Sequence, residues 1–336
     1  MLFIETTPAT THTSGRIDYI DLLKGFAILW IVWWHTSHPS FVDPYYHVPI
    51  FFFISGLFFK PYSLKKYLNK KTTTIIIPFL FFYFISYIYR IALHIWDHRT
   101  IEGFPWINIF DIFKCMPNGD YLWVNVPIWF LPCLFNVCIF YFFLAKLPKW
   151  IRYLYILLVV LFTNTITQIS TPFFINEAIR WTAYYALGDM IGKELITIVK
   201  NKKNALIIIA ISIIIYVIIY FIPNSEKQIS SSIKLNLLTI TFLIFVFSLF
   251  SFFKENIITD SLKYYGKNSL IVLGFHAPVL IVYQRIIYSI YGRINYWGGF
   301  AVFIATSLTM LAIIPIVTRF LPRFVGKAPI KSLKSS

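Results

Sequence analysis

Residues 205–222 read ALIIIAISIIIYVIIYFI, a run of 18 residues without a charged side chain. About 20 such residues in a helix cross a hydrocarbon core about 30 Å thick. The run does not alternate between apolar and polar positions, as the strands of an outer-membrane barrel do. This stretch therefore predicts a transmembrane α-helix.

The rest of the chain has the same character. Of its 336 residues, 58% are hydrophobic and 13% are charged, and the mean hydropathy is +0.70. Soluble domains are about 45–50% apolar and about 25% charged, so the composition excludes a soluble or disordered protein. It predicts an all-α polytopic membrane protein with about ten transmembrane helices. The predicted spans are residues 20–37, 47–60, 75–96, 123–145, 151–169, 176–192, 205–222, 233–253, 269–288 and 298–320.

The net charge of +16 would suggest nucleic-acid binding in a soluble protein. When the ten spans alternate from a cytoplasmic N-terminus, 22 of the 30 Lys and Arg residues fall on the cytoplasmic side. Cytoplasmic loops carry such an excess of positive charge, so we expect both termini in the cytoplasm and no nucleic-acid partner. We expect one transmembrane domain over residues 16–325, between a polar tail at 1–15 and a basic tail at 326–336.

The first predicted span carries the most ionisable groups. Residues 16–35 read RIDYIDLLKGFAILWIVWWH, and ionisable side chains inside a membrane are functional candidates by default. Asp21, Lys24 and His35 share one helical face, with His35 about 16 Å above Lys24 along the axis. A lysine that snorkels to the interface and a histidine that only packs would also explain these residues. The shared face favours a functional site.

Other polar residues lie in apolar surroundings. Ser55 precedes a glycine in the second predicted span, and Trp129 opens a Trp-Phe-Leu sequence in the fourth. Ser269 and His276 are seven residues apart and therefore share a helical face. Helix packing alone explains each of these residues, so each is a candidate only in combination with the others.

Four lysines follow the second predicted span. Lys65, Lys66, Lys70 and Lys71 lie on the predicted cytoplasmic side, where they could bind a phosphorylated ligand or face anionic lipid. The chain has no Gly-rich phosphate loop, no His-Glu-x-x-His and no Gly-x-Ser-x-Gly. The three cysteines are scattered. We therefore expect no metal and no permanently bound cofactor.

Taken in order, these motifs resemble the membrane-bound acyltransferase 3 family of bacterial surface-glycan O-acetyltransferases, which includes fucose 4-O-acetylase-like members. The resemblance covers residues 14–325. The matching segments are Arg16, Asp21, Lys24-Gly25 and His35; Phe52–Gly56; Trp129–Leu131; Leu187-Gly188; and Gly266–His276.

The resemblance implies a multi-pass enzyme of the bacterial inner membrane. Its donor would be a cytoplasmic acyl-CoA, most often acetyl-CoA, and its acceptor a hydroxyl of a cell-surface or lipid-linked polysaccharide. Membrane lipid and a glycan synthase or export complex would be its further partners.

The resemblance also implies residue roles. His35 would be the general base or a covalent acyl relay, with Asp21 and Lys24 beside it. The phosphates of the acyl-CoA would contact Arg16, Lys24, Lys65, Lys66, Lys70 and Lys71. The substrate cavity would be lined by Ser55, Trp129, Ser269 and His276.

Two other functions fit the composition equally well. A transporter or flippase of a glycan intermediate would use ten spans and interior charges without acyl-CoA, and would tolerate His35→Ala better than Lys24→Ala. A membrane scaffold for a glycan synthase would need neither residue.

Overall fold

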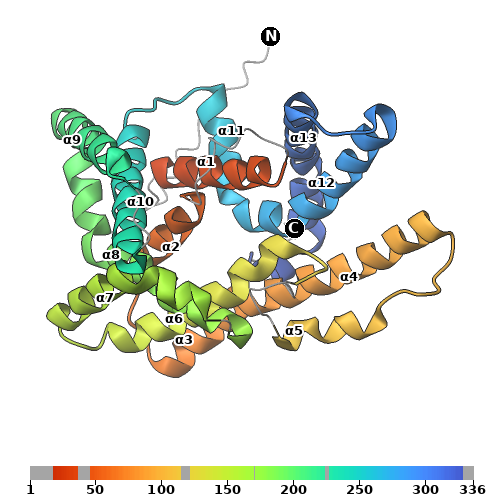
Figure 1. Ribbon diagram of the computed structural model, residues 1–336, viewed down its shortest axis with the longest axis horizontal. Coiled ribbons are helices and arrows are strands. Elements are labelled where there is room, and N and C mark those ends of the chain that lie inside the picture. Colours follow the sequence, from red (N-terminus) through yellow and green to blue (C-terminus); the bar gives the residue numbers. More distant parts are fainter. Residues whose placement is uncertain (1–17, 37–45, 115–121, 170, 224–226, 328–336) are drawn as a thin grey trace, which may run out of the picture.

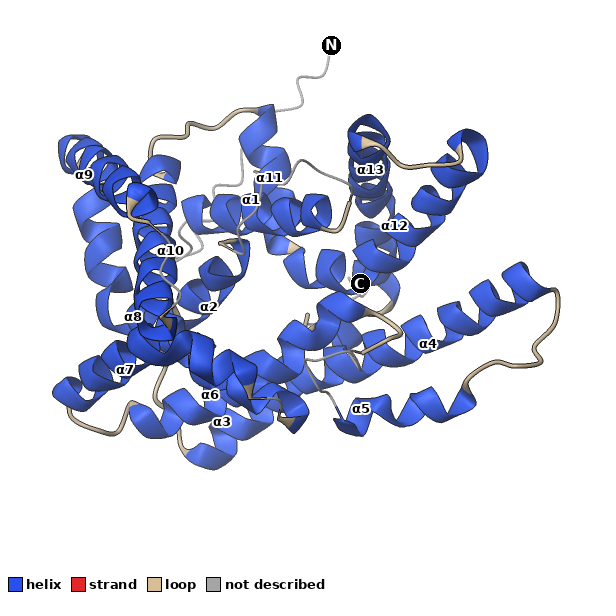
Figure 2. Ribbon diagram, in the orientation of Figure 1, coloured by secondary structure: helices blue, strands red, loops and turns tan. Residues whose placement is uncertain are grey.

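The computed structural model describes residues 18–36, 46–114, 122–169, 171–223 and 227–327. Every regular element in these ranges is a helix (Figure 2). The α-helices are α1 (Asp18–Trp34), α2 (His47–Leu57), α3 (Leu64–Lys71), α4 (Ile77–His98), α5 (Asp111–Lys114), α6 (Phe130–Leu144), α7 (Lys149–Gln168), α8 (Ile175–Val199), α9 (Lys202–Phe221), α10 (Gln228–Phe250), α11 (Ile257–Lys267), α12 (Ser269–Tyr291) and α13 (Tyr296–Phe320). A π-helix, Thr72–Ile76, joins α3 to α4, and a 3-10 helix, Val126–Trp129, leads into α6.

Seven helical segments of the described chain are long and apolar enough to cross a membrane. They are Leu64–His98, Val126–Leu144, Lys149–Gln168, Lys202–Phe221, Gln228–Phe250, Ser269–Tyr291 and Tyr296–Phe320. The protein is thus an all-α polytopic membrane protein, as its composition predicts.

Each of the ten predicted spans overlaps one α-helix. Three of these helices do not meet the length or the composition of a full span. The helix α1 has 17 residues, α2 has 11 residues, and α8 contains several charged residues. The number of ten spans and the cytoplasmic placement of the termini therefore stay predictions. The two predicted tails lie almost wholly outside the described residues.

The helix α1 occupies the middle of the fold. In Figure 1 it lies between the group α7–α10 and the pair α12 and α13, with α4 and α6 below. It contacts α2, α10, α11, α12 and α13. The residues of α1 that carry the predicted site are therefore enclosed by segments from both halves of the sequence.

The crossing of α1 and α11 depends on two glycines. A Cβ at Gly25 would overlap the carbonyl oxygen of Leu262, and a Cβ at Gly266 would overlap that of Asp21. Small residues allow helix backbones to approach closely in membranes. The Lys24-Gly25 pair and the late Gly266 of the sequence motifs therefore meet at one contact.

A second crossing joins α2 and α8 in the same way. A Cβ at Gly56 would overlap the carbonyl oxygen of Tyr185, and a Cβ at Gly188 would overlap that of Phe53. Gly56, which follows Ser55 in the second predicted span, thus lies at a close approach of two backbones. Two segments far apart in sequence are held together by a glycine from each.

We expect Gly266→Ala to lower the free energy of unfolding by about 1–3 kcal/mol, because the added methyl group forces two backbones apart. Gly298→Ala is the matched control, since its Cβ would meet only side-chain atoms, the nearest at 3.3 Å. The measurement is the midpoint of thermal unfolding in detergent. Equal midpoints for the two variants would contradict the close crossing.

Candidate active site

A cavity of about 280 Å³ lies among α1, α2, the π-helix Thr72–Ile76, the start of α6 and the start of α12. Most of its wall is apolar. Residues with polar atoms in the lining are Lys24, Trp34, His35, His47, Ser55, Thr74, Trp129 and Ser269. The structure thus brings together five residues that the sequence singles out from four separate segments: Lys24, His35, Ser55, Trp129 and Ser269.

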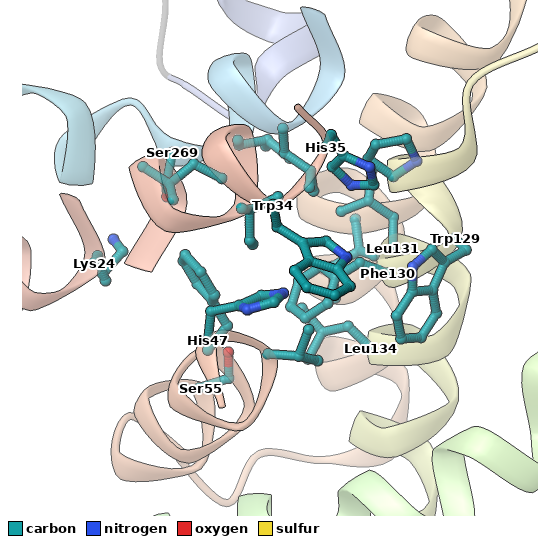
Figure 3. A pocket seen from close by; sticks show the side chains of 18 of the residues that line it. Lys24, Trp34, His35, His47, Ser55, Trp129, Phe130, Leu131, Leu134 and Ser269 are labelled. Carbon is teal, nitrogen blue, oxygen red and sulfur yellow. The ribbon is translucent and has the colours of Figure 1, made fainter. Parts of the chain in front are cut away.

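Lys24 and His35 lie at different ends of this cavity (Figure 3). Both come from α1 or its end, and the amide of His35 still donates a hydrogen bond to the carbonyl of Ile31 at 3.2 Å. The helical spacing therefore extends to His35, although α1 ends at Trp34. A cation and an imidazole about 16 Å apart along the axis thus share one cavity.

Asp21 accompanies Lys24 but does not line the cavity. Its carboxylate lies 3.6 Å from the Lys24 ammonium group, and Asp21 is buried at the α1–α11 crossing. A buried carboxylate one turn away holds the ammonium group in place. Asp21 therefore fits a role in positioning Lys24 at the cavity wall.

His276 packs against the ring of His35 and does not line the cavity. The two rings are 5.4 Å apart between centroids, and His276 is fully buried. Its Nδ1 lies 2.8 Å from the carbonyl oxygen of Val272 and 3.1 Å from that of Leu273. Because carbonyl oxygens only accept, Nδ1 carries the proton. Nε2 is then the acceptor, and it has no hydrogen-bond partner among the described residues.

The helix around His276 is supported by Asn125, which precedes the 3-10 helix Val126–Trp129. Pro278 has no amide hydrogen, so the carbonyl of Gly274 lacks its helical donor. The side-chain amide of Asn125 donates to this carbonyl at 2.8 Å and to the hydroxyl of Ser86 at 2.8 Å. These bonds fix the segment of α12 that carries His276.

His47 is a cavity residue that the sequence reasoning missed. It begins α2, is 3% exposed, and packs against the rings of Trp30 and Trp34 at centroid distances of 5.9 and 6.1 Å. Its Nδ1 is buried without a hydrogen-bond partner in the described part of the chain. The available signal was an ionisable residue within the predicted span 47–60, the same criterion that singles out His35.

The predicted phosphate-binding lysines lie on α3, next to the π-helix that lines part of the cavity. Lys70 and Lys71 are within about one helical turn of Thr74, which lines the cavity, and Lys65 and Lys66 lie further back on α3. None of these four is a lining residue. Lys66 and Lys70 both lie over the ring of Tyr62, at 5.0 and 5.2 Å, and Lys71 lies over Tyr67 at 5.4 Å. Arg16 lies outside the described residues.

A protein-family model described as an acyltransferase domain, acyltransferase 3, matches residues 17–319. The chain belongs to the acyltransferase 3 family. Searches of curated proteins and of solved structures gave no significant match.

As an acyltransferase 3 family member, the protein is a membrane acyltransferase. The match covers every segment that lines the cavity, from α1 to the start of α12. The family match and the cavity therefore concern the same part of the molecule.

Proposed function

We propose that this acyltransferase 3 family member transfers an acetyl group, or another short acyl group, from cytoplasmic acyl-CoA to a hydroxyl of a cell-surface or lipid-linked polysaccharide. The observation that carries the proposal is the cavity with Lys24 at one end and His35 at the other. We place the protein in a bacterial inner membrane, beside a glycan synthase or export complex and with lipid around it. It needs no permanently bound cofactor for this reaction.

The cavity suits the arm of the donor rather than its nucleotide. Its volume of about 280 Å³ is near the lower end of small-molecule sites, which are about 300–1,000 Å³. A pantetheine arm is long, narrow and largely uncharged, which matches the apolar wall between Lys24 and His35. The phosphates would then stay on the side of Lys24, near Lys70 and Lys71.

His35 would act on the acceptor hydroxyl. An imidazole ionises near neutral pH, so it can accept a proton and return it. As base, His35 takes the hydroxyl proton, the oxygen attacks the thioester carbonyl, the C–S bond breaks and the CoA thiolate leaves, taking the proton from His35. As relay, a ring nitrogen of His35 attacks the thioester carbonyl, the C–S bond breaks, and CoA leaves as the thiol with the proton that the ring gives up. The hydroxyl oxygen then attacks the acyl-imidazole, the C–N bond breaks, and the hydroxyl proton returns to the ring nitrogen. Both routes need the imidazole at the thioester end of the cavity.

Ser55 and Ser269 would shape the cavity along the donor, and Trp129 would shape it around the acyl end. Trp129 lies on the His35 side in Figure 3, where its ring could also pack against an acceptor sugar. His276 would hold the imidazole of His35 from behind.

We expect Lys24→Gln to weaken acetyl-CoA binding about tenfold, because a charge-assisted contact to phosphate is lost. The same substitution should leave the affinity for S-acetylpantetheine unchanged, since this donor fragment has no phosphate. Lys200→Gln, a change at an exposed lysine after α8, is the control. The measurement is isothermal titration of the purified protein in detergent with both thioesters. Equal affinity of wild type and Lys24→Gln for acetyl-CoA would contradict the placement of the donor.

A further inference from the structure

A second hollow, of about 720 Å³, lies between the end of α4 and the C-terminal half of α12. Residues 93–97 form one wall and residues 281–294 the other, and we refer to it as the α4–α12 groove. It shares no lining residue with the cavity around His35. The groove is therefore a separate candidate binding site.

A hydrogen bond connects a residue of the groove to the backbone of His35. Gln284 lines the groove, and its side-chain amide donates to the carbonyl oxygen of His35 at 3.4 Å. On the same helix, Ser269 lines the cavity 15 residues earlier, which corresponds to about 22 Å of helix. His35 thus lines the cavity, and its backbone carbonyl is bonded to a residue of the groove.

The polar groups of the groove suit a ligand rich in hydroxyls. The guanidinium group of Arg285 pairs with the carboxylate of Asp97, and the two side chains are 41% and 38% exposed. Because the pair balances its own charge, it offers hydrogen-bond donors and acceptors without a net positive charge for a phosphate. Gln284 and Ser289 add neutral polar groups to the same wall.

Two aromatic rings stand in the groove. Trp96 is 71% exposed and Tyr288 is 61% exposed. Large rigid rings bind the apolar face of a ligand, while nearby polar groups fix its orientation. A sugar ring has this character, with C–H groups on its faces and hydroxyls around its edge.

The remaining lining is apolar. Leu93, Ile281 and Val282 form part of it, and they belong to helices that are long and apolar enough to span a membrane. In a bilayer such a wall lies beside lipid chains and can hold a hydrocarbon chain.

We propose that the α4–α12 groove binds the acceptor as a sugar carried on a lipid: Trp96, Asp97, Gln284 and Arg285 take the sugar, and the apolar wall takes the first part of the lipid. This inference rests on the proposed function. It deepens that function by naming where the acceptor binds and by selecting a lipid-linked sugar over a finished polymer. The donor and the acceptor then approach His35 from different sites.

The test uses acetyl-CoA turnover by the full-length protein in lipid nanodiscs. The acceptors are methyl and octyl glycosides of glucose, galactose, fucose and N-acetylglucosamine. We expect at least one octyl glycoside to stimulate turnover with a saturable KM below that of its methyl counterpart. Trp96→Ala should raise the KM for both chain lengths about tenfold and leave the KM for acetyl-CoA unchanged. Trp150→Ala removes an indole that is 66% exposed on α7 and is the control.

A second substitution tests the part of the groove that would bind the lipid chain. Val282→Trp fills the apolar wall, so it should raise the KM for the octyl glycoside and leave that for the methyl glycoside nearly unchanged. Ile290→Trp is a control on the same helix, because Ile290 is 65% exposed and lies outside the groove. Partition of octyl glycosides into the bilayer affects all variants alike. The difference in KM between Val282→Trp and Ile290→Trp therefore reports binding in the groove.

Three results would overturn the inference. The first is equal KM values for Trp96→Ala and Trp150→Ala. The second is turnover with crude envelope glycan but with none of the octyl glycosides. The third is a KM for the octyl glycoside that rises with the phosphatidylglycerol content of the nanodisc in the wild type and not in Trp96→Ala. This result would assign the groove to a phospholipid. Failure of the proposed function is a different result, namely no acetyl-CoA turnover with any acceptor, crude envelope glycan included.

Discussion

His35→Ala should reduce acyl transfer by about 10²–10⁴-fold, the usual contribution of a general acid–base group. Acetyl-CoA should still bind with an affinity close to that of the wild type, because Lys24 and the apolar walls are unchanged. His35 lines the cavity at the end away from Lys24. In the proposed mechanism the imidazole acts on the thioester end and contributes little to holding the phosphates.

The measurement is acetyl-CoA consumption and binding by purified wild type and His35→Ala, with crude envelope glycan as acceptor. Tyr153→Ala is the control, because Tyr153 is exposed on α7 and lines neither the cavity nor the α4–α12 groove. A His35→Ala variant that turns over at the wild-type rate would remove the imidazole from the reaction. Failure of the wild type to bind either acetyl-CoA or succinyl-CoA would favour the function of a transporter.

His276→Phe should reduce kcat about 10- to 100-fold while leaving the KM for acetyl-CoA unchanged, because a small displacement of a catalytic group is enough to slow a reaction by about 10². The ring of His276 packs 5.4 Å from that of His35, and its Nε2 is a buried acceptor. Phenylalanine keeps the packing and removes both nitrogens. His276 is thus expected to position His35 and not to touch the substrate.

Two amide variants separate positioning from simple packing. His276→Asn keeps a donor near the place of Nδ1, and His276→Gln places polar atoms near the place of Nε2. We expect His276→Gln to retain more of kcat than His276→Asn, and the pH dependence of kcat to shift in the less active variants. Equal kcat values for wild type, the Phe variant and both amide variants, with similar thermal stability, would show that His276 only fills space.

The sequence predicts the helices well because apolar runs of this length have few alternatives. All ten predicted spans overlap a helix, including the run at residues 205–222, which is α9. The helix α11 is absent from the prediction. Its 11 residues include Asp260 and Lys263, so it lacks the apolar character that identifies a span. Its place is set by tertiary contact, at the glycine crossing with α1.

The site is predicted in part for a similar reason. Helical spacing on a single segment links Lys24 to His35, and both line the cavity. It also places Asp21 on that face, but a neighbouring helix covers Asp21, and spacing within one helix carries no information about its neighbours. The placement of His276 behind His35 depends on how α12 packs against α1, which local pattern cannot supply.

In the proposed mechanism, the thioester end of the donor reaches His35 while its phosphates stay near Lys24. Bromoacetyl-CoA tests it most directly, because a ring nitrogen close to the bromomethyl carbon displaces bromide and becomes permanently alkylated. Mass spectrometry of the digested protein then identifies the labelled residue. We expect label on His35, and we expect it to be suppressed by excess acetyl-CoA and absent in His35→Ala. Label confined to residues outside the cavity, or label that acetyl-CoA does not suppress, would contradict it.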